Sequence, residues 1–274
     1  MTKYKFDKKI VVKSYGVVCV VRTNAPDALR SIRSVLRRYL PGCGFLRSDA
    51  SARHEFFYSW NASGLDSLYG ATEPAARRGR RDSLLASLGS RVRITVAEYA
   101  PERVFIHAGV VGWKGRAIVI PARSFKGKTS LTAALVRCGA LYYSDEYAIL
   151  DKRGRVHPFP KELSLRGVMN ELEQVDHPVE TLGGKAGKRP LPVGLVVVSE
   201  YKKRAKWKPE IQNSAGGILE MINNTVSIRR DPKFVLPILS NVASNALIVK
   251  SKRGEAETTA PLILSLLERH FRNS

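Results

Sequence analysis

The sequence predicts an α/β protein with two domains, a smaller α/β domain over residues 1–100 and a second α/β domain over residues 101–274. Apolar runs of strand length alternate with runs whose apolar residues recur at helical spacing. Hydrophobic residues make up 44% of the 274 residues, enough to build a sizeable core. After residue 103 the order becomes strand, helix, strand, and this change places the domain boundary near residue 100.

The first domain begins with a strand and a helix. Residues 15–22, YGVVCVVR, form an apolar run that predicts a buried strand. Asp27–Leu40 has the spacing of an amphipathic helix, and Pro41-Gly42 ends it. Residues 53–60, RHEFFYSW, are rich in aromatic side chains and predict a second strand.

The end of the first domain is less regular. Residues 71–81 are small, polar and basic, and they predict an exposed loop. Residues 84–99 keep leucine, valine and tyrosine at helical spacing, although the stretch RVRITV within them alternates like a strand. We favour a helix for this segment.

The second domain opens with two strands and a helix. VFIHAGVVGW and GRAIVIP are apolar runs split by a turn at Gly115. The following helix, Thr129–Arg137, is closed by Gly139. Its predicted buried face contains Leu131, Ala134, Leu135 and Cys138.

The rest of the second domain alternates strands, loops and helices. LYYSDEYAILD predicts the next strand and its turn, and Gly183–Arg189 predicts a basic loop. GLVVVSEY predicts a further strand, and the C-terminal part is mostly helical. Asp231-Pro232 is a good helix start, because aspartate can cap a helix and proline suits its first turn.

Charge is the unusual feature of the composition. Lys+Arg number 46 against 24 Asp+Glu, a formal net charge of +22, with clusters at Lys3–Lys13, Arg77–Arg81 and Lys202–Lys208. A solvated basic surface explains such clusters, and so does an acidic partner such as a peptide, RNA or an anionic membrane. The sequence contains no recognisable nucleic-acid-binding module, so a nucleic-acid role would depend on charge alone.

The sequence gives little sign of secretion or membrane insertion. MTKYKFDKKI is too polar for a signal peptide, and no apolar run approaches the roughly 18 residues of a membrane span. The three cysteines, an odd number, contain no CxxC pair that would suggest zinc or a redox site. These features predict a cytoplasmic protein with reduced thiols.

The segment PARSFKGKTSL predicts a phosphate-binding loop. Its second half matches the end of the G-x-x-x-x-G-K-[ST] pattern, in a strand–loop–helix context. The first N–H groups of a helix lack internal partners and carry partial positive charge, so they hold an anion. We expect Lys128 to reach the phosphates and the Thr129 hydroxyl to coordinate Mg²⁺. The predicted loop residues are Ala122, Arg123, Ser124, Phe125, Lys126, Gly127, Lys128, Thr129 and Ser130.

Alanine occupies the first glycine position of this pattern. Glycine is favoured there because the backbone can need a positive φ and because nothing should crowd the phosphate. Ala122 adds one methyl group, so the loop works if φ at Ala122 is negative.

The segment HAGVVGWKGRAIVIPARSFKGKTSLTAALVRCGALYYSDEYAILDKRGRVHPFP resembles the catalytic domain of the HPr kinase/phosphorylase family. It is most similar to a bacterial HPr-kinase-related branch, some members of which phosphorylate peptide serines during peptide natural-product maturation. The resemblance is strong over residues 103–160, weaker over 190–265 and faint over 1–100. It implies a P-loop kinase domain that uses ATP and Mg²⁺.

The resemblance also implies roles for an acidic pair. A kinase must orient a hydroxyl and accept its proton. Asp145 and Glu146 follow the strand after the loop helix, and in a parallel sheet this strand end faces the same crevice as the loop. By the resemblance, Asp145 is the base and Glu146 the acid on the Mg²⁺ side, although the family normally has aspartate at the second position. The alternative is that Asp145 caps a turn.

His107 lies within an otherwise apolar run. A histidine in this position is usually a hydrogen-bonded core residue, but the family has a histidine just before a glycine here, near its catalytic acid. The resemblance therefore implies that His107 orients Asp145, whereas His157 is expected to be structural.

Two family features lack a clear counterpart. The family's IEIRG-like segment reads LSLRG here (Leu163–Gly167), without the glutamate that helps to hold Mg²⁺. Arg189 is a weak match for the family's later phosphate-stabilising arginine.

The leading hypothesis is an ATP- and Mg²⁺-dependent kinase of a serine hydroxyl in a peptide or small protein. We expect an acidic or carboxylate-bearing acceptor, attracted by the basic loops, and the N-terminal domain could recognise this partner. An NTP-binding accessory protein without transferase activity and a kinase of a small metabolite remain alternatives, and a homo-oligomer is compatible with the sequence.

Overall fold

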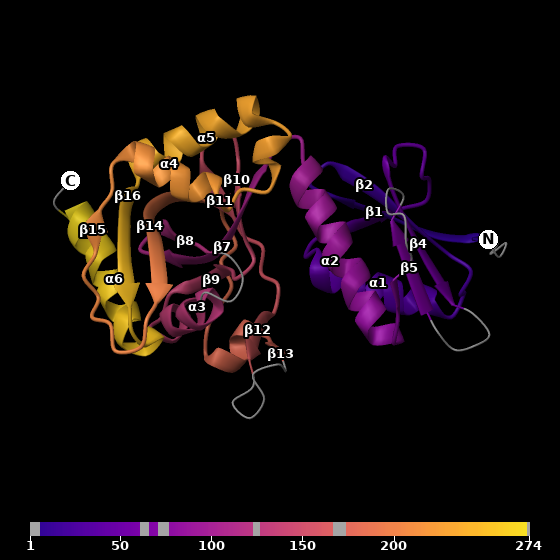
Figure 1. Cartoon of the computed structure of the whole chain (residues 1–274), viewed down its shortest axis with the longest axis horizontal. Helices are drawn as coiled ribbons and strands as arrows, with labels where there is room; N and C mark the ends of the chain where they lie inside the picture. The colour runs from indigo at the N-terminus through magenta and orange to yellow at the C-terminus, as the bar shows by residue number, and fades with distance from the viewer. Residues whose placement is uncertain (1–5, 61–65, 71–76, 123–126, 167–173, 273–274) are drawn as a thin grey trace. The chain divides into compact units, whose positions relative to one another are not determined.

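A computed structural model describes residues 6–60, 66–70, 77–122, 127–166 and 174–272. The chain forms two compact units, Met1–Glu102 and Arg103–Ser274 (Figure 1). Each unit combines a β-sheet with α-helices, so the α/β class predicted from the sequence is confirmed.

The first unit contains a sheet with the strand order β3-β1-β2-β4-β5-β6 in its described part. The strands are β1 (Lys8–Ser14), β2 (Val17–Thr23), β3 (Gly44–Leu46), β4 (His54–Trp60), β5 (Asp66–Gly70) and β6 (Arg77–Gly79). Two helices, α1 (Ala28–Tyr39) and α2 (Arg81–Tyr99), pack against each other. Gly89 of α2 permits this close packing, because a Cβ there would lie 2.6 Å from the Tyr39 ring.

Several predictions for the first unit are confirmed. Residues 53–60 form β4, and the predicted helices correspond to α1 and α2. The strand predicted over 15–22 begins at Val17, because Tyr15 and Gly16 have positive φ and form the turn between β1 and β2. Strand β1 is not predicted from the sequence, because its lysines belong to the cluster Lys3–Lys13, which indicates a charged surface.

The loop predicted over residues 71–81 is wrong in its second half. Arg77–Gly79 pairs with β5 as strand β6, and α2 begins at Arg81. Pairing with a neighbouring strand overrides the local preference of these basic residues for an exposed loop. Residues 71–76 lie outside the described residues.

In its described part, the second unit is built on an eight-stranded sheet with the path β11-β10-β7-β8-β14-β16-β15, with β9 paired to β7. Its strands are β7 (Val104–Trp113), β8 (Arg116–Pro121), β9 (Leu141–Ser144), β10 (Tyr147–Leu150), β11 (Arg155–His157), β14 (Leu191–Tyr201), β15 (Glu210–Ile211) and β16 (Leu247–Arg253). A separate two-stranded sheet contains β12 (Leu163–Arg166) and β13 (Gln174–His177).

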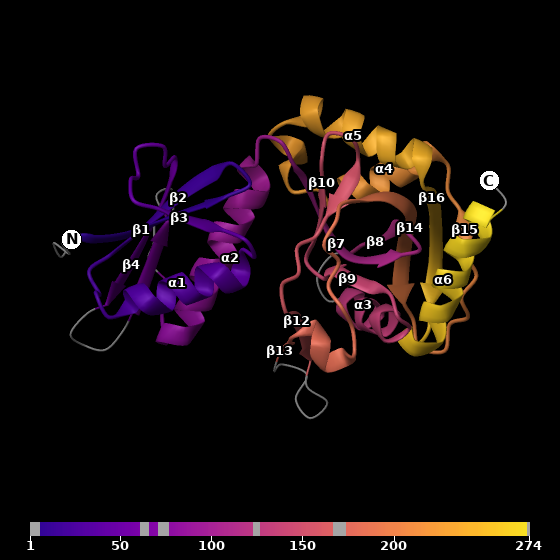
Figure 2. The same ribbon diagram turned by 180° about the vertical axis from the view of Figure 1, so that it is seen from behind.

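Helices cover both faces of the large sheet. They are α3 (Lys128–Arg137), α4 (Ser214–Ile222), α5 (Pro232–Asn245) and α6 (Ala256–Arg272), with short 3₁₀ turns at Val179–Leu182 and Ser227–Arg229. One apolar cluster joins α3 and α6 to the sheet, and a second joins α4 and α5 to it. Figures 1 and 2, seen from opposite sides, show this three-layer arrangement. Asp231 caps α5 as expected, accepting a hydrogen bond from the Phe234 N–H.

The large sheet is mixed, whereas the sequence suggested a parallel one. Strand β7 is antiparallel to both β8 and β9, while β8, β14 and β16 run parallel. Because β8 and β9 are both antiparallel to β7, they run in the same direction, and their C-terminal ends still lie at the same edge of the sheet. The expected closeness of the phosphate loop and the acidic pair is therefore preserved by a different topology.

Two smaller expectations are corrected. LYYSDEYAILD forms two strands, β9 and β10, rather than one strand and a turn. Leu131, Ala134 and Leu135 are buried on α3 as expected, but Cys138 is exposed because the helix ends at Arg137. Among the described helices, none combines the length and apolar character needed to cross a membrane.

Candidate active site

The phosphate loop leaves the end of β8 beside the middle of β7. The Ala122 N–H donates a hydrogen bond to the His107 carbonyl at 3.3 Å. Ala122 is buried and does not have a positive φ, which is the condition under which alanine can replace glycine there. Arg123, Ser124, Phe125 and Lys126 lie outside the described residues.

The loop ends at Gly127, which begins helix α3. Gly127 has φ +74°, a left-handed conformation that favours glycine, and no side chain among the described residues caps the helix. The first intrahelical bond runs from the Leu131 N–H to the Gly127 carbonyl. The N-terminal end of the helix carries a partial positive charge that suits a phosphate, and Ser130 is exposed there.

Arg253 fixes the position of this helix start. Its guanidinium donates to the Gly127 carbonyl at 2.7 Å and to the Gly254 carbonyl at 3.0 Å. The side chain is 2% exposed, and this burial lowers its pKa from the ordinary arginine value. A Cβ at Gly127 would lie 2.5 Å from the Arg253 guanidinium, so glycine is needed there for space as well as for φ.

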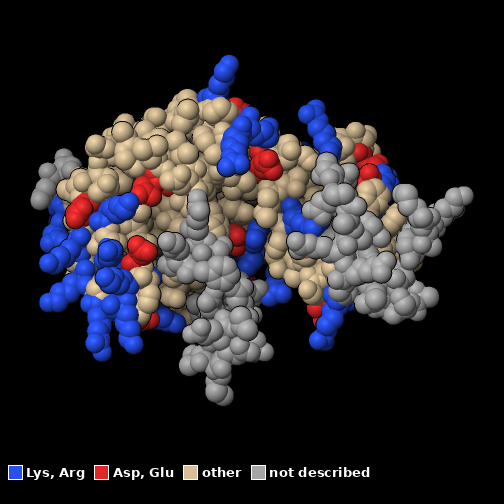
Figure 3. Space-filling model, viewed as in Figure 1, with Lys and Arg blue, Asp and Glu red and all other residues tan. Residues whose placement is uncertain are grey.

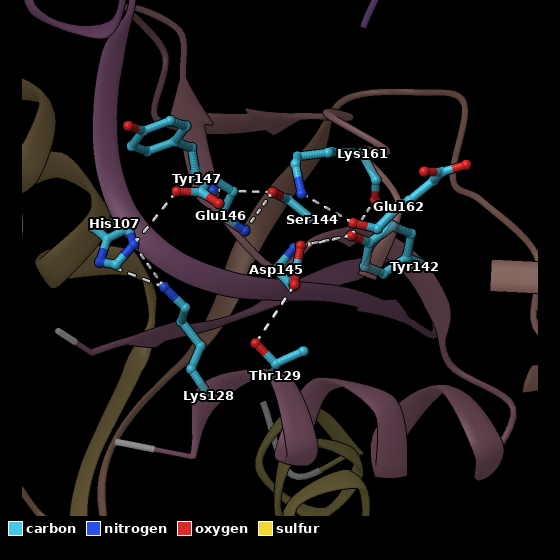
Figure 4. A network of polar contacts seen from close by, with 10 residues as sticks. All are labelled: His107, Lys128, Thr129, Tyr142, Ser144, Asp145, Glu146, Tyr147, Lys161 and Glu162. Carbon is cyan, nitrogen blue, oxygen red and sulfur yellow. Dashed lines mark hydrogen bonds and ion pairs between the residues drawn. The ribbon is translucent and has the colours of Figure 1, made fainter. Parts of the chain in front are cut away.

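Lys128 points from the first turn of α3 to His107 on β7 (Figure 4). The lysine side chain is buried, and its Nζ lies 2.9 Å from His107 Nε2. Since an ammonium group can only donate, the histidine accepts through an unprotonated ring nitrogen. His107 Nε2 also lies 3.6 Å from a carboxylate oxygen of Glu146. His107 thus bridges the phosphate-loop lysine and the second acid of the pair.

Asp145 lies on the other side of the same cluster. One carboxylate oxygen accepts a hydrogen bond from the Thr129 hydroxyl at 3.4 Å, and the other lies 3.0 Å from the Tyr142 hydroxyl. Burial raises the pKa of Asp145 above its ordinary value, and the nearby Glu146 charge adds to this rise. The charge of Lys161 opposes it, as do the bond from Tyr142 and the charge of Lys128.

Tyr142 cannot satisfy all its acceptors at once. Its single hydroxyl proton faces the Lys161 carbonyl at 2.6 Å and the Asp145 carboxylate at 3.0 Å, while its oxygen accepts from the Asp145 N–H. Donation to the closer carbonyl leaves one oxygen of Asp145 facing another oxygen. Donation to Asp145 instead lowers the pKa of this carboxyl, opposite to the effect of burial.

Ser144 makes the turn that presents the acidic pair. Its hydroxyl oxygen accepts from the N–H groups of Glu146 at 3.0 Å and Tyr147 at 2.9 Å. The Glu146 carbonyl accepts from the Ala108 N–H, which ties the turn to β7. The turn-capping role considered for Asp145 is therefore performed by Ser144, and the Asp145 carboxylate is directed toward the phosphate loop.

Sequence reasoning missed Lys161, Tyr142 and Arg253. Lys161 is buried, donates to the Glu162 carbonyl at 3.3 Å and is the strongest cationic influence on Asp145. No pattern distinguishes a buried cation among 46 lysines and arginines. The only available signals were the position of Arg253 before a glycine at a strand end and the aromatic pair that precedes Ser144.

The other candidates contact residues outside this cluster or lie beyond the described side chains. Arg189 is exposed, and its carbonyl accepts from the Tyr143 hydroxyl at 2.7 Å. His157 contacts Asp151 at 2.9 Å, in agreement with a structural role. Leu163–Arg166 forms β12, whereas Gly167 lies outside the described residues.

The cluster fits Mg²⁺ bound together with phosphates. The described residues contain no group of three or more His, Cys, Asp or Glu side chains that could hold a metal by themselves. Magnesium in phosphate-transfer sites typically uses one or two carboxylates, phosphate oxygens and water. The Thr129 hydroxyl beside the Asp145 carboxylate supplies protein ligands of this kind.

Comparison with solved structures finds a distant likeness. No protein-family model and no curated protein matches the sequence. The structure of the Hpr(Ser) kinase/phosphatase from Coxiella burnetii matches at 14% identity and a TM-score of 0.36, covering 62% of this chain and 97% of that chain. A likeness of this size carries no activity over to this chain.

Proposed function

We propose that this protein is an ATP- and Mg²⁺-dependent kinase that phosphorylates a serine hydroxyl in an acidic peptide or small protein. One observation carries the proposal. A buried lysine and a threonine at the start of a helix face a histidine and two carboxylates, with Lys128 Nζ 2.9 Å from His107 and the Thr129 hydroxyl 3.4 Å from Asp145. When bound, ATP supplies the phosphoryl group and Mg²⁺ neutralises charge on it.

The residues of the cluster divide the work of such a kinase. Lys128 and the first N–H groups of α3 bind the phosphates, and Arg253 holds Gly127 so that these groups stay aligned. Asp145 accepts the proton of the acceptor hydroxyl. A base whose pKa is raised toward the working pH is more effective than an ordinary carboxylate.

Glu146 takes the metal-side position in this assignment, with its carboxylate beside the contact between His107 and Lys128. The 3.4 Å contact between Thr129 and Asp145 favours a second assignment, in which Asp145 takes the metal side and Glu146 the proton. Both assignments use the same cluster, and they differ in which variant changes the dependence on metal concentration.

The substitution Lys128→Met tests the phosphate site. Methionine keeps the buried aliphatic stem but removes the ammonium group, so the fold should persist while ATP binding is lost. Calorimetric titration with a non-hydrolysable ATP analogue and Mg²⁺ measures the effect, and circular dichroism checks the fold. Lys233→Met, at an exposed position in α5, is the matched control and should bind normally. Equal affinity of Lys128→Met and the wild-type protein would show that the assignment is wrong.

A further inference from the structure

A second charged region lies beside the phosphate loop, on the side away from the acidic pair. A pocket of about 960 Å³ opens at the ends of β8, β14 and β16, and Pro121 and Ala122 form its border with the phosphate loop. Seven of the described residues that line it are basic and three are acidic. The basic ones are Lys202, Lys203, Arg204, Lys206, Lys208, Lys250 and Lys252. We call this region the basic pocket, and Figure 3 shows Lys and Arg side chains gathered over this end of the unit.

Most of these cations are available to a ligand. Lys250 forms an ion pair with Glu220 at 2.6 Å. The other six are exposed, and the described part of the chain places no acidic side chain in an ion pair with them. A group of exposed cations without internal partners repels itself, so binding an anion stabilises it.

Lys202–Lys208, the loop that supplies most of the cations of the basic pocket, has a defined shape. Lys202–Ala205 forms a tight turn, closed by a bond from the Ala205 N–H to the Lys202 carbonyl at 2.9 Å, with Arg204 at φ +62°. The Lys208 N–H donates to the Ser251 hydroxyl at 3.1 Å, which fixes the other end of the loop. The turn therefore presents its three cations from an ordered backbone.

This loop is connected to the phosphate site by hydrogen bonds. The Lys202 N–H donates to the Arg253 carbonyl at 2.9 Å, and the Arg253 guanidinium holds the Gly127 carbonyl. Gly254 is required at this crossing, because a Cβ there would lie 2.7 Å from the Ala205 carbonyl oxygen. A ligand bound by the loop is thus held at a fixed distance from the phosphate site.

The lining favours a carboxylate-rich segment over the nucleoside of ATP. A nucleoside pocket is usually apolar, with aromatic faces for the base. None of the described residues that line the basic pocket is aromatic. Its many cations instead match several negative charges close together.

The spacing between the two charged regions sets the size of the acceptor. The acidic pair precedes β10, and the path β10-β7-β8-β14-β16 leads to the basic pocket. Neighbouring strands are about 4.8 Å apart, so three to four spacings give roughly 14–19 Å. An extended chain covers about 3.3–3.6 Å per residue, so roughly four to six residues bridge this distance.

We propose that the basic pocket binds an acidic segment of the acceptor polypeptide, about four to six residues from the serine that lies at the acidic pair. This inference depends on the proposed kinase function and adds where the acidic segment of its polypeptide substrate lies; a small metabolite cannot occupy both regions.

Fluorescein-labelled serine peptides test this inference by anisotropy, with the ATP analogue present. One peptide carries four glutamates five residues from its serine, the second carries four glutamines there, and the third has the glutamates adjacent to the serine. We expect the first peptide to bind at least tenfold more tightly than the second, with most of this preference lost at 0.5 M salt. Neutralising Lys202, Lys203 and Arg204 to alanine should weaken the first peptide about tenfold.

Two controls separate the pocket from general charge and from the nucleotide. A triple variant of Lys152, Arg153 and Lys233 to alanine removes the same charge from exposed positions outside the basic pocket and should leave peptide binding unchanged. Affinity for the ATP analogue should be unchanged in both triple variants. If the pocket variant lost as much affinity for the ATP analogue as for the first peptide, the pocket would be a nucleoside site and the inference would be overturned. Tighter binding of oligo(uridylate), lost in the pocket variant, would overturn it in favour of RNA.

Phosphorylation distinguishes a failure of this inference from a failure of the proposed function. Transfer to the serine is measured with labelled ATP, and the first peptide should have a lower KM than the third. Equal transfer to all three peptides would support the kinase and overturn the acidic subsite. Binding of the first peptide by the pocket without transfer to any peptide would support the acidic ligand and refute the kinase.

Discussion

The acidic pair and the basic pocket flank the same phosphate loop, yet they handle charge in opposite ways. At the acidic pair, Lys128 and Asp145 are buried and make polar contacts within the cluster, Lys128 with His107 and Asp145 with Thr129. At the basic pocket, six cations are exposed and have no acidic partner in the described part of the chain. Buried, paired groups have shifted pKa values and fixed directions, which chemistry requires. Exposed, unpaired groups attract and orient a partner with little change in their own properties.

This contrast predicts that changes at the acidic pair affect turnover, whereas changes at the basic pocket affect the KM for the acceptor. The largest effect is expected for Asp145→Asn. The amide keeps the shape of the carboxylate but cannot accept the proton, so transfer should fall roughly 10²–10⁴-fold with little change in ATP affinity. Single-turnover transfer and analogue binding measure the two quantities. Asp231→Asn, which preserves the cap of α5, is the matched control.

Glu146→Gln and His107→Ala sharpen this test. If Asp145 is the base, Glu146→Gln should raise the Mg²⁺ concentration needed for half-maximal transfer, while Asp145→Asn should not. The reverse pattern would exchange the two roles. His107→Ala should reduce transfer less than Asp145→Asn, because positioning neighbouring groups contributes less to the rate than accepting the proton does. Nearly unchanged turnover in both acid variants would remove the acidic pair from the mechanism.

Much of the region around the phosphate loop could be predicted from the sequence. What could be predicted depends on residues close together in the chain, and what could not depends on residues far apart in it. The strand before the loop, the helix that begins at Lys128 and the positions of Asp145 and Glu146 follow from local patterns, which depend on neighbouring residues. The antiparallel β7 between β8 and β9 could not be predicted, because strand pairing depends on segments far apart in the chain.

The missed site residues have the same physical origin. Arg253 is separated from Gly127 by 126 positions, and only the fold brings its guanidinium to the carbonyl. Lys161 resembles every other lysine of a strongly basic chain until its burial beside Asp145 is known. The sequence shows that Lys202–Lys208 is a cluster of basic residues, but it does not show that this cluster lies beside the phosphate loop.

Arg253 is the connection between the two regions, and its replacement should have an intermediate effect. Arg253→Met removes a buried charged donor to the Gly127 carbonyl, a bond that contributes about 1.5–3 kcal/mol to stability, so ATP affinity should fall by at most roughly ten- to a hundredfold through the loss of alignment. Arg253→Lys keeps the charge but loses the two-carbonyl geometry and should be partly active. Calorimetry with the ATP analogue measures both variants, with thermal unfolding to check the fold. Unchanged affinity in a folded Arg253→Met protein would show that Arg253 does not position the loop.

The smallest effect is expected from Lys161→Met, and it appears as a change in pH dependence. Lys161 lowers the pKa of Asp145 against the larger rise caused by burial, so its removal should raise this pKa further. Glu146, Lys128, Thr129 and Tyr142 face the same carboxylate and remain in place. If transfer needs ionised Asp145, the acid limb of the pH–rate profile should move to higher pH in Lys161→Met and much less in Lys161→Arg.

The pH dependence of folding stability should also change in Lys161→Met. Because the folded pKa of Asp145 is raised above the ordinary carboxyl value of 3.8, the folded state holds this proton more tightly than the unfolded chain does. Its favourable contribution is complete below the ordinary carboxyl pKa and is lost as pH rises through the folded pKa. Relative to the wild-type protein, Lys161→Met should therefore lose thermal stability as pH increases, because ionised Asp145 then lacks the cation that lowers its pKa most. An acid limb and a pH-dependent Tm that both coincide with those of the wild-type protein would show that Lys161 does not act on Asp145, and the buried charges of this cluster would then need another explanation.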